Sequence, residues 1–429
     1  MIRNGMRGRL GWLFLFLTLP LGLAGQDLDR ARATIGTLTS PDFHGRGYVN
    51  GGDRIAARFL EGQFREMGLK AFDTAYVQPF PLDINTFPGR VSLKIDKKKL
   101  VPGQEYLVNP VSQGGRGRGR IVFLDTLIFT QEAARQRFLK GDFRRNVMVY
   151  ESRHYANLTE LSPDYLNKMH EARALIELHP AKLTMSLSPA QVSHPAFELV
   201  KKDLPAGAKK AAYRVDATLV KGYPSQNVIG YVPGKKHPDE YIVISAHYDH
   251  LGRMGKDTYF PGANDNASGT TLMLELARHY ARPENQPDYS VAFMAFGAEE
   301  VGLIGSRYYT EHPLFPLDQI KFMINLDLLG TGEEGMMVVN GTRLPEVFDR
   351  LTQLNAAKNY LPKLQKRDNA PNSDHYFFTR RGVKAVFIYL MGGPKFYHDV
   401  YDRAETLPLT KFKESFELIR DFVAAGQWE

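Results

Sequence analysis

The sequence of 429 residues contains no cysteine. This absence excludes disulfide bonds, a cysteine nucleophile, a lipid anchor on a cysteine and thiolate ligands for zinc. A metal ion bound by this protein would therefore need histidine and carboxylate ligands. The chain can be stable without disulfides, because 43% of its residues are hydrophobic and its length allows a large core.

The sequence also has no internal repeat and no low-complexity tract, and its 24% charged residues are ordinary for a globular protein. The formal charge of +8 is mild for this length. The most basic stretch, Gly-Gly-Arg-Gly-Arg-Gly-Arg at residues 114–120, has no interleaved aromatic residues on which bases could stack. We therefore predict a solvated loop at this stretch and no binding of nucleic acid.

The amino terminus has the pattern of a secretory signal peptide. Arg3, Arg7 and Arg9 precede an apolar run over residues 10–23, and small residues follow this run. The run is shorter than the about 20 residues that span a bilayer comfortably. We predict that residues 1–25 are a cleaved leader and that the mature protein is periplasmic or extracellular, with no stable membrane insertion. An uncleaved membrane anchor is the alternative.

Three segments of the mature chain differ in pattern. In residues 26–90, apolar side chains recur at helical spacing from Asp53 to Met67. Residues 91–216 contain short alternating runs between polar or glycine-rich breaks, which predict an inserted β-rich domain. In residues 217–429, apolar strand-like runs alternate with amphipathic helices. This last pattern predicts an α/β fold with a mostly parallel central sheet and helices on both faces.

The pattern in the carboxyl-terminal segment predicts five strands and four helices. The strands are expected at residues 241–246, 290–296, 321–326, 336–340 and 385–389. The helices are expected at residues 268–281, 344–357, 373–381 and 410–425.

Five potential metal ligands follow or adjoin these strands. They are His247, Asp265, Glu300, Asp327 and His398. Such α/β sheets place their sites at the carboxyl ends of the strands, so we expect these side chains to meet at one edge. Each alone also fits an ordinary structural role, such as a helix N-cap for Asp265. Five such coincidences at one edge explain the pattern less well than one metal site does.

These residue types suit metal-assisted hydrolysis. Histidine and carboxylate ligands fit Zn²⁺, and a carboxylate that bridges two ions helps to stabilise the attacking and developing oxygens. A further carboxylate must move a proton to the leaving group. The neighbouring Glu299 and Glu300 can supply one base and one ligand. Asp249, two residues after His247, can accept the other imidazole N–H.

The motifs resemble those of the co-catalytic zinc aminopeptidases of clan MH, metallopeptidase family twenty-eight. They are SAHYDHLG at 245–252, PGANDNASG at 261–269, FGAEEVGLIGS at 296–306, NLD at 325–327, SDH at 373–375 and YH at 397–398. Their order covers most of residues 225–410. The segment 91–216 is similar, more weakly, to a protease-associated domain.

The resemblance implies a ligand set for two Zn²⁺ per chain. Asp265 would bridge the two ions. His247 and Asp327 would complete one site, and Glu300 and His398 would complete the other.

The resemblance also implies roles outside the metal ligands. Glu299 would be the general base and then the general acid, and Asp249 would be the hydrogen-bond partner of His247. Tyr397 would steady the tetrahedral oxyanion, and the peptide bond after Asp265 would be cis. Arg403 replaces the threonine that is usual in the family, which puts the local turn in doubt.

Two further residues in the motifs receive structural interpretations. His250 is interpreted as pocket lining or core. Ser373 is interpreted as the cap of the helix expected at 373–381.

The function that this resemblance implies is aminopeptidase hydrolysis of peptide substrates. The alternatives are a carboxypeptidase or dipeptidase with the same two-metal core, a glutaminyl cyclase with one zinc, and an inactive binding module. Co²⁺ or Mn²⁺ could replace Zn²⁺, and the oligomeric state is left open.

Overall fold

The computed structural model describes residue 1 and residues 27–426. The predicted leader, residues 1–25, therefore lies outside the described residues except for residue 1. The described chain forms two eight-stranded sheets. The first is formed by the predicted α/β segment together with one strand from residues 77–86, and all strands of the second lie between residues 91 and 215.

The first sheet has a parallel centre, and the strand next to the centre on each side, β10 or β14, pairs with it in the antiparallel direction. Strands β12, β11, β13 and β16 are adjacent and parallel. Strands β1 and β10 extend the sheet on one side, and β14 and β15 extend it on the other. In the order of the sheet, the strands are β1 (Val77–Thr86), β10 (Thr218–Val232), β12 (Tyr289–Phe296), β11 (His237–His247), β13 (Ile320–Leu326), β16 (Ala385–Met391), β14 (Gly335–Val339) and β15 (Leu364–Arg367).

Helices cover both faces of this sheet. One face packs against α1 (Leu28–Leu38), α2 (Gly52–Glu66), α6 (Gly269–Tyr280), α8 (Pro345–Lys358) and α10 (Phe412–Ala424). The other face packs against α7 (Ile304–Glu311) and α9 (His375–Arg380). The predicted α/β fold with helices on both faces is confirmed.

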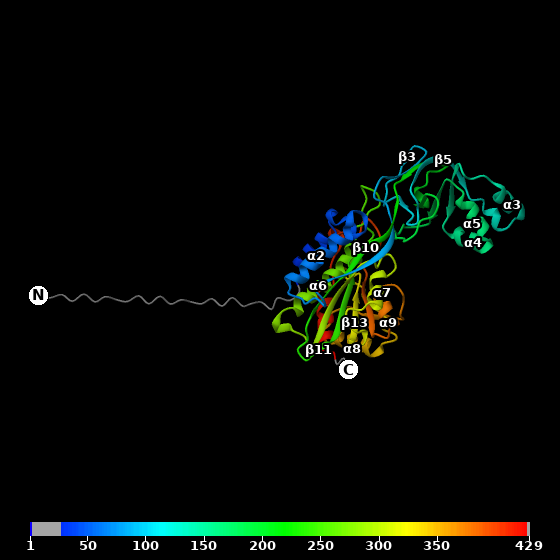
Figure 1. Cartoon of the computed structure of the whole chain (residues 1–429). Coiled ribbons are helices and arrows are strands. Elements are labelled where there is room, and N and C mark those ends of the chain that lie inside the picture. Colours follow the sequence, from blue (N-terminus) through cyan, green and yellow to red (C-terminus); the bar gives the residue numbers. More distant parts are fainter. Residues whose placement is uncertain (2–26, 427–429) are drawn as a thin grey trace.

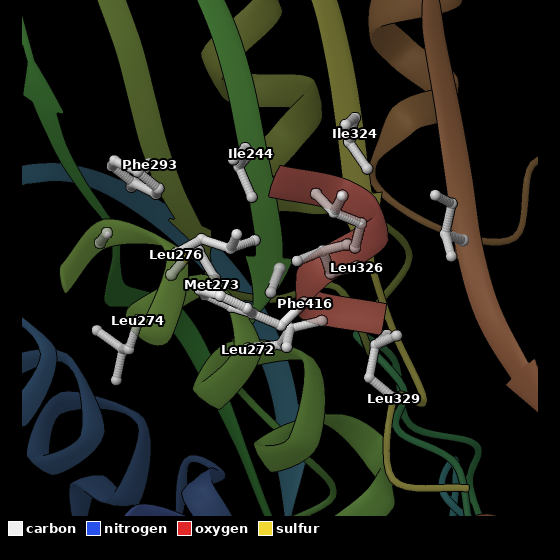
Figure 2. Close-up of a cluster of buried hydrophobic side chains, with 14 of the residues drawn as sticks. Ile244, Leu272, Met273, Leu274, Leu276, Phe293, Ile324, Leu326, Leu329 and Phe416 are labelled. Carbon is white, nitrogen blue, oxygen red and sulfur yellow. The ribbon is translucent and has the colours of Figure 1, made fainter. Parts of the chain in front are cut away.

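The apolar face of α6 explains why this helix packs on the central strands. Leu272, Met273 and Leu276 are fully buried and lie against Ile244 of β11 and Phe293 of β12 (Figure 2). Burying side chains of this size contributes roughly 1.5–3 kcal/mol each. This packing fixes the start of α6, and therefore the loop that carries Asp265, against the ends of the strands.

Every strand and helix expected in residues 217–429 is present, with boundaries that differ by at most four residues. The helix expected from Asp53 to Met67 is α2. Among the described residues, no helix combines the length and the apolar character needed to cross a membrane.

The second sheet lies at one end of the molecule, where β3, β5 and helices α3, α4 and α5 are grouped (Figure 1). Its strands, in order, are β3 (Lys98–Lys99), β2 (Val91–Ile95), β9 (Lys210–Val215), β5 (Gly115–Phe123), β6 (Asn146–Glu151), β7 (Ala174–His179), β8 (Ala196–Val200) and β4 (Tyr106–Val108). The helices are α3 (Glu132–Lys140), α4 (Arg153–Leu161) and α5 (Pro163–His170). We call residues 91–216 the inserted domain. Its relation to protease-associated domains stays a prediction.

The prediction of a solvated loop at residues 114–120 is wrong, because most of this stretch belongs to β5. Its arginines are exposed, whereas its glycines face close neighbours. A Cβ on Gly117 would lie 2.8 Å from the Tyr213 hydroxyl, and one on Gly119 would lie 2.7 Å from the Arg145 carbonyl oxygen. The glycines thus allow close packing on one face of a strand whose other face carries charge.

Candidate metal centre

The carboxyl edge of the parallel strands brings together the first group of predicted ligands. His247 is the last residue of β11, and Asp327 directly follows β13. Asp265 lies in the segment Ala263–Ser268 that precedes α6. The His247 Nε2 atom lies 3.4 Å from Asp265 Oδ1 and 3.4 Å from Asp327 Oδ1. All three side chains are buried.

The second oxygen of Asp265 faces a second group. His398 Nε2 lies 3.1 Å from Asp265 Oδ2 and 3.0 Å from Glu300 Oε2. Glu300 follows β12, and His398 follows β16, so this group also forms at the carboxyl edge. Asp265 is therefore shared between two clusters, as a bridging ligand would be.

The donor set fits divalent metal ions. The potential ligand atoms of His247, Asp265 and Asp327 lie within 4.8 Å of one another, as do those of His250, Asp265 and Glu300. Asp327 Oδ1 is buried and accepts no hydrogen bond from the described residues. Buried acceptors normally receive a hydrogen bond, so this carboxylate oxygen, which faces His247 Nε2 at 3.4 Å without accepting one, is suited to a cation.

The electrostatics of the cluster favour positive charge. Burial alone would lower the pKa of His247, but the carboxylates of Glu299 and Asp327 raise it well above its ordinary value. Burial likewise opposes protonation of His398, and Glu300 and Asp265 raise its pKa to about 11. The same carboxylates that stabilise imidazolium would stabilise a bound cation.

His250, interpreted from the sequence as pocket lining or core, directly contacts one of the predicted ligands. Its Nδ1 atom lies 2.7 Å from Glu300 Oε1, and its ring is fully buried. Its position three residues after His247 was visible in the sequence, but no feature there showed which side chain it would contact.

Ser373 does not cap a helix, so that prediction is wrong. The N-cap of α9 is Asp374, which makes no side-chain capping bond. The Ser373 hydroxyl instead donates to Asp327 Oδ2 over 3.2 Å and accepts a bond from Asn325 Nδ2 over 2.7 Å. Helix α9 begins at His375, two residues later than expected, and the Ser373 hydroxyl is directed to Asp327 instead.

Asp249 holds the turn that carries the two glutamates. Its carboxylate accepts the backbone N–H groups of Glu299 and Glu300 over 3.1 and 3.4 Å, and the Tyr48 hydroxyl over 3.3 Å. The His247 Nδ1 atom lies 3.2 Å from the Asp249 carbonyl oxygen and 3.8 Å from its carboxylate. The expected contact with His247 is thus made at shorter range by the backbone than by the side chain.

Glu299 lies beside the cluster but is not one of the grouped ligands. Burial raises the pKa of its carboxyl well above the ordinary value; nearby His247 opposes this shift, whereas Glu300 adds to it. A carboxyl with a raised pKa holds a proton more readily, so it can accept a proton and later return it.

Tyr397, the Asp265–Asn266 peptide and Arg403 complete the predicted features. The Tyr397 ring stacks on the His398 ring with centroids 3.9 Å apart, and the side chain is 53% exposed. The Asp265–Asn266 peptide bond is cis. Arg403 makes a local turn contact, because its Nε donates to the Val400 carbonyl oxygen over 2.9 Å.

Sequence reasoning missed Arg46. Its guanidinium is completely buried and donates five hydrogen bonds of 2.7–3.2 Å to backbone carbonyl oxygens. The acceptors belong to Leu38, Tyr248, Pro261, Gly262 and Asp265. Burial lowers the pKa of Arg46 to about 10, and the surrounding carboxylates limit the fall. No local pattern could reveal this role, since most of the acceptors lie some 200 residues away.

Comparison with known proteins places these motifs among peptidases. Residues 227–423 match the model of Peptidase family M28. Aminopeptidase YwaD of Bacillus subtilis is 30% identical over 258 residues, which are 58% of this chain and 54% of that protein. Leupeptin-inactivating enzyme 1 of Streptomyces exfoliatus is 30% identical over 168 residues, 38% of this chain and 35% of that protein. The alignment thus spans about half the length of the first of these relatives.

Solved structures share the fold over nearly the whole chain. The zinc aminopeptidase BSAP from Bacillus subtilis has a TM-score of 0.70 at 20% identity, with 93% of this chain and 94% of that chain covered. The aminopeptidase from Aneurinibacillus sp. strain AM-1 has a TM-score of 0.62 at 23% identity, with 93% of each chain covered.

Proposed function

We propose that this chain, whose residues 227–423 match the model of Peptidase family M28, is a zinc-dependent aminopeptidase that hydrolyses the amino-terminal bond of peptides. The observation that carries this proposal is the placement of the Asp265 carboxylate between two clusters. One of its oxygens faces His247 and the other faces His398.

The five predicted ligands would hold two Zn²⁺ ions. His247 and Asp327 would bind one ion, Glu300 and His398 would bind the other, and Asp265 would contact both. Bound zinc supplies a Lewis acid and lowers the pKa of water enough to provide a nucleophile at neutral pH. Histidine and carboxylate donors, with one buried carboxylate oxygen that accepts no hydrogen bond from the described residues, support this assignment.

Glu299 is the residue of this chain that moves the proton. Its carboxylate takes a proton from the attacking water and returns it to the nitrogen of the leaving amine. Burial and the charge of Glu300 raise its pKa, which makes the protonated form accessible for the second transfer. Asp249 keeps Glu299 in place through the backbone N–H of Glu299.

Tyr397 is proposed to donate its phenolic O–H to the oxyanion that forms on the substrate carbonyl. Stacking on His398 limits the movement of the ring, and its 53% exposure leaves the side chain accessible to substrate.

The choice of amino-terminal specificity is supported by the similar proteins, since both YwaD and BSAP are named aminopeptidases. A carboxypeptidase or dipeptidase with the same metal core remains the alternative. A one-zinc cyclase accounts less well for two ligand clusters that share Asp265. We further propose that residues 1–25 are an export leader and that residues 91–216 are a protease-associated-like domain.

The test combines elemental analysis of the purified protein with a panel of aminoacyl-4-nitroanilides. We expect about two zinc ions per chain, release of nitroaniline, and loss of release on treatment with a chelator. Asp265→Asn should lower the zinc content and abolish activity. Asp368→Asn, which affects an exposed ion pair with Arg343, is the matched control and should change neither.

The outcomes separate the alternatives. Two zinc ions without nitroaniline release would direct the search to carboxypeptidase or dipeptidase substrates. One zinc ion would favour the cyclase, and no zinc would refute the ligand assignment.

A further inference from the structure

We propose that the inserted domain contributes to the metal site, because its segment Lys182–Met185 orients His398, one of the proposed ligands. This inference rests on the proposed function, since it assigns a role to a contact of a zinc ligand. The segment follows β7 of the inserted domain, whereas His398 belongs to the loop after β16. The two are 213 residues apart in sequence.

The first contact selects the tautomer of the His398 imidazole. Its Nδ1 atom lies 2.7 Å from the carbonyl oxygen of Met185. A carbonyl oxygen can only accept, so Nδ1 must carry the hydrogen. In the neutral ring, Nε2 then has the free lone pair, and this atom faces Asp265 and Glu300. The Met185 carbonyl thereby fixes the tautomer and the ring orientation that a metal ligand needs.

The second contact fixes the backbone of the ligand. The Met185 N–H donates to the His398 carbonyl oxygen over 3.2 Å, so the two residues pair through two hydrogen bonds. His398 has a φ of 54°, in the left-handed region that residues other than glycine adopt rarely. Such a conformation persists where its surroundings hold it.

The third contact is electrostatic and is made by Lys182. Its ammonium donates to the carbonyl oxygens of Lys395 and Tyr397, each over 2.9 Å. It also lies 3.1 Å from the Asp399 carboxylate. One cation therefore holds the chain on both sides of His398 and keeps Tyr397 over the His398 ring.

The segment is anchored in an apolar cluster that the inserted domain shares with residues outside it, such as Met254 and Val400. Met185 and Leu183 are buried, at 1% and 8% exposure, in a cluster that includes Val147 of β6 and Ile176 of β7. A change in the position of this domain would therefore move the groups that hydrogen-bond to His398. Partners that orient a metal-bound histidine typically affect metal affinity or activity by 10- to 100-fold.

The first experiment compares Lys182→Met with Lys201→Met in the full-length enzyme. Lys201 is also in the inserted domain, and its ammonium forms an exposed ion pair with Glu151. Zinc affinity is measured by competition with a chelator, and kcat and KM are measured separately. We expect Lys182→Met to bind one of the two zinc ions about 10-fold more weakly, the other ion unchanged, and kcat to fall. Lys182→Arg should restore both.

The second experiment weakens the Met185 carbonyl as the acceptor of the His398 Nδ1–H bond and leaves the side chains unchanged. Replacing Ser186 by its α-hydroxy acid turns the Met185 carbonyl into an ester carbonyl, which is a poorer acceptor. We expect the same selective loss of zinc affinity as for Lys182→Met. This variant decides the question if Lys182→Met does not fold.

The outcomes distinguish this inference from the proposed function. The inference would be overturned if the Lys182→Met or the ester variant had the same zinc affinities and kcat as the Lys201→Met control. The parent enzyme would then still be an active zinc peptidase. A parent protein that bound no zinc and cleaved no peptide would overturn both.

Discussion

The carboxylate of Asp402 accepts a hydrogen bond from the backbone N–H of Asp265 over 3.0 Å. It also accepts the N–H of Asn264 over 2.9 Å, and its own carbonyl oxygen accepts the N–H of Ala263 over 3.1 Å. Asp402 lies four residues after His398. It therefore joins the loop of Asp265, which is proposed to bridge both ions, to the loop of His398, which is proposed to bind one of them.

We predict that Asp402→Asn lowers kcat/KM by about 10- to 100-fold, because the amide offers one acceptor where the carboxylate offers two. The amide NH₂ would also face a backbone N–H. Kinetics on a nitroanilide substrate, with zinc content measured in parallel, check this prediction. Asp368→Asn removes a carboxylate at an exposed position and should leave kcat/KM unchanged. Equal kinetics for the two variants would contradict a role for Asp402.

The neighbouring glutamates allow a direct comparison of base and ligand. Glu299→Gln should reduce kcat by roughly 10²- to 10⁴-fold, because glutamine cannot transfer the proton. Its zinc content should equal that of the parent, since Glu299 is not among the five residues proposed to hold the ions. Glu300→Gln should instead lose zinc. Loss of zinc from Glu299→Gln, or full zinc in an inactive Glu300→Gln, would reverse the two assignments.

Ser373→Ala tests the hydroxyl that orients Asp327. The variant loses the donor to Asp327 Oδ2 and leaves Asn325 Nδ2 without its acceptor. We expect a loss of about 1 kcal/mol in unfolding free energy and a measurable fall in zinc affinity. Ser415→Ala is the matched control, because Ser415 is equally buried but bonds to the backbone of Lys411 in α10. A zinc affinity equal to that of the control would show that Asp327 needs no such support.

The central part of the fold could be predicted because its signals are local. Apolar runs such as Ile242–Ile244 predict buried parallel strands, and ligands directly after such runs must meet at one edge. His247 and Asp327 could therefore be placed from the sequence. The prediction for the glycine–arginine stretch in β5 was wrong, because glycine is a weak strand former. The close approach of Tyr213 explains why the strand has glycine at position 117, and this approach is not visible in the sequence.

The supporting contacts could not be predicted because they join distant parts of the chain. Arg46 bonds to the Asp265 carbonyl oxygen across 219 residues, and Met185 contacts His398 across 213. No spacing rule connects such pairs. Serine before a helix usually caps it, which is why the sequence predicts that role for Ser373. In the structure the Ser373 hydroxyl instead donates to the Asp327 carboxylate.

The last prediction concerns the pH dependence of stability at Asp53, a buried residue of α2 outside the metal cluster. Burial raises the pKa of its carboxyl from 3.8 to about 6, although hydrogen bonds from Tyr223 and Ser225 oppose the shift. The folded state therefore binds this proton more tightly than the unfolded state. The resulting stabilisation is complete below pH 3.8 and is lost as the pH rises through about 6.

Asp53→Asn removes this titration, so the unfolding free energy of the parent should fall relative to that of the variant by roughly 1 kcal/mol between pH 5 and pH 7.5. Urea unfolding of both proteins at the two pH values measures the difference, and contributions from other groups cancel in the comparison. Asp349→Asn, at an exposed position of α8, should show no such change. A parent–variant difference independent of pH would mean that Asp53 keeps an ordinary pKa despite its burial, and that its bonds to Tyr223 and Ser225 fully compensate the cost of burying its charge.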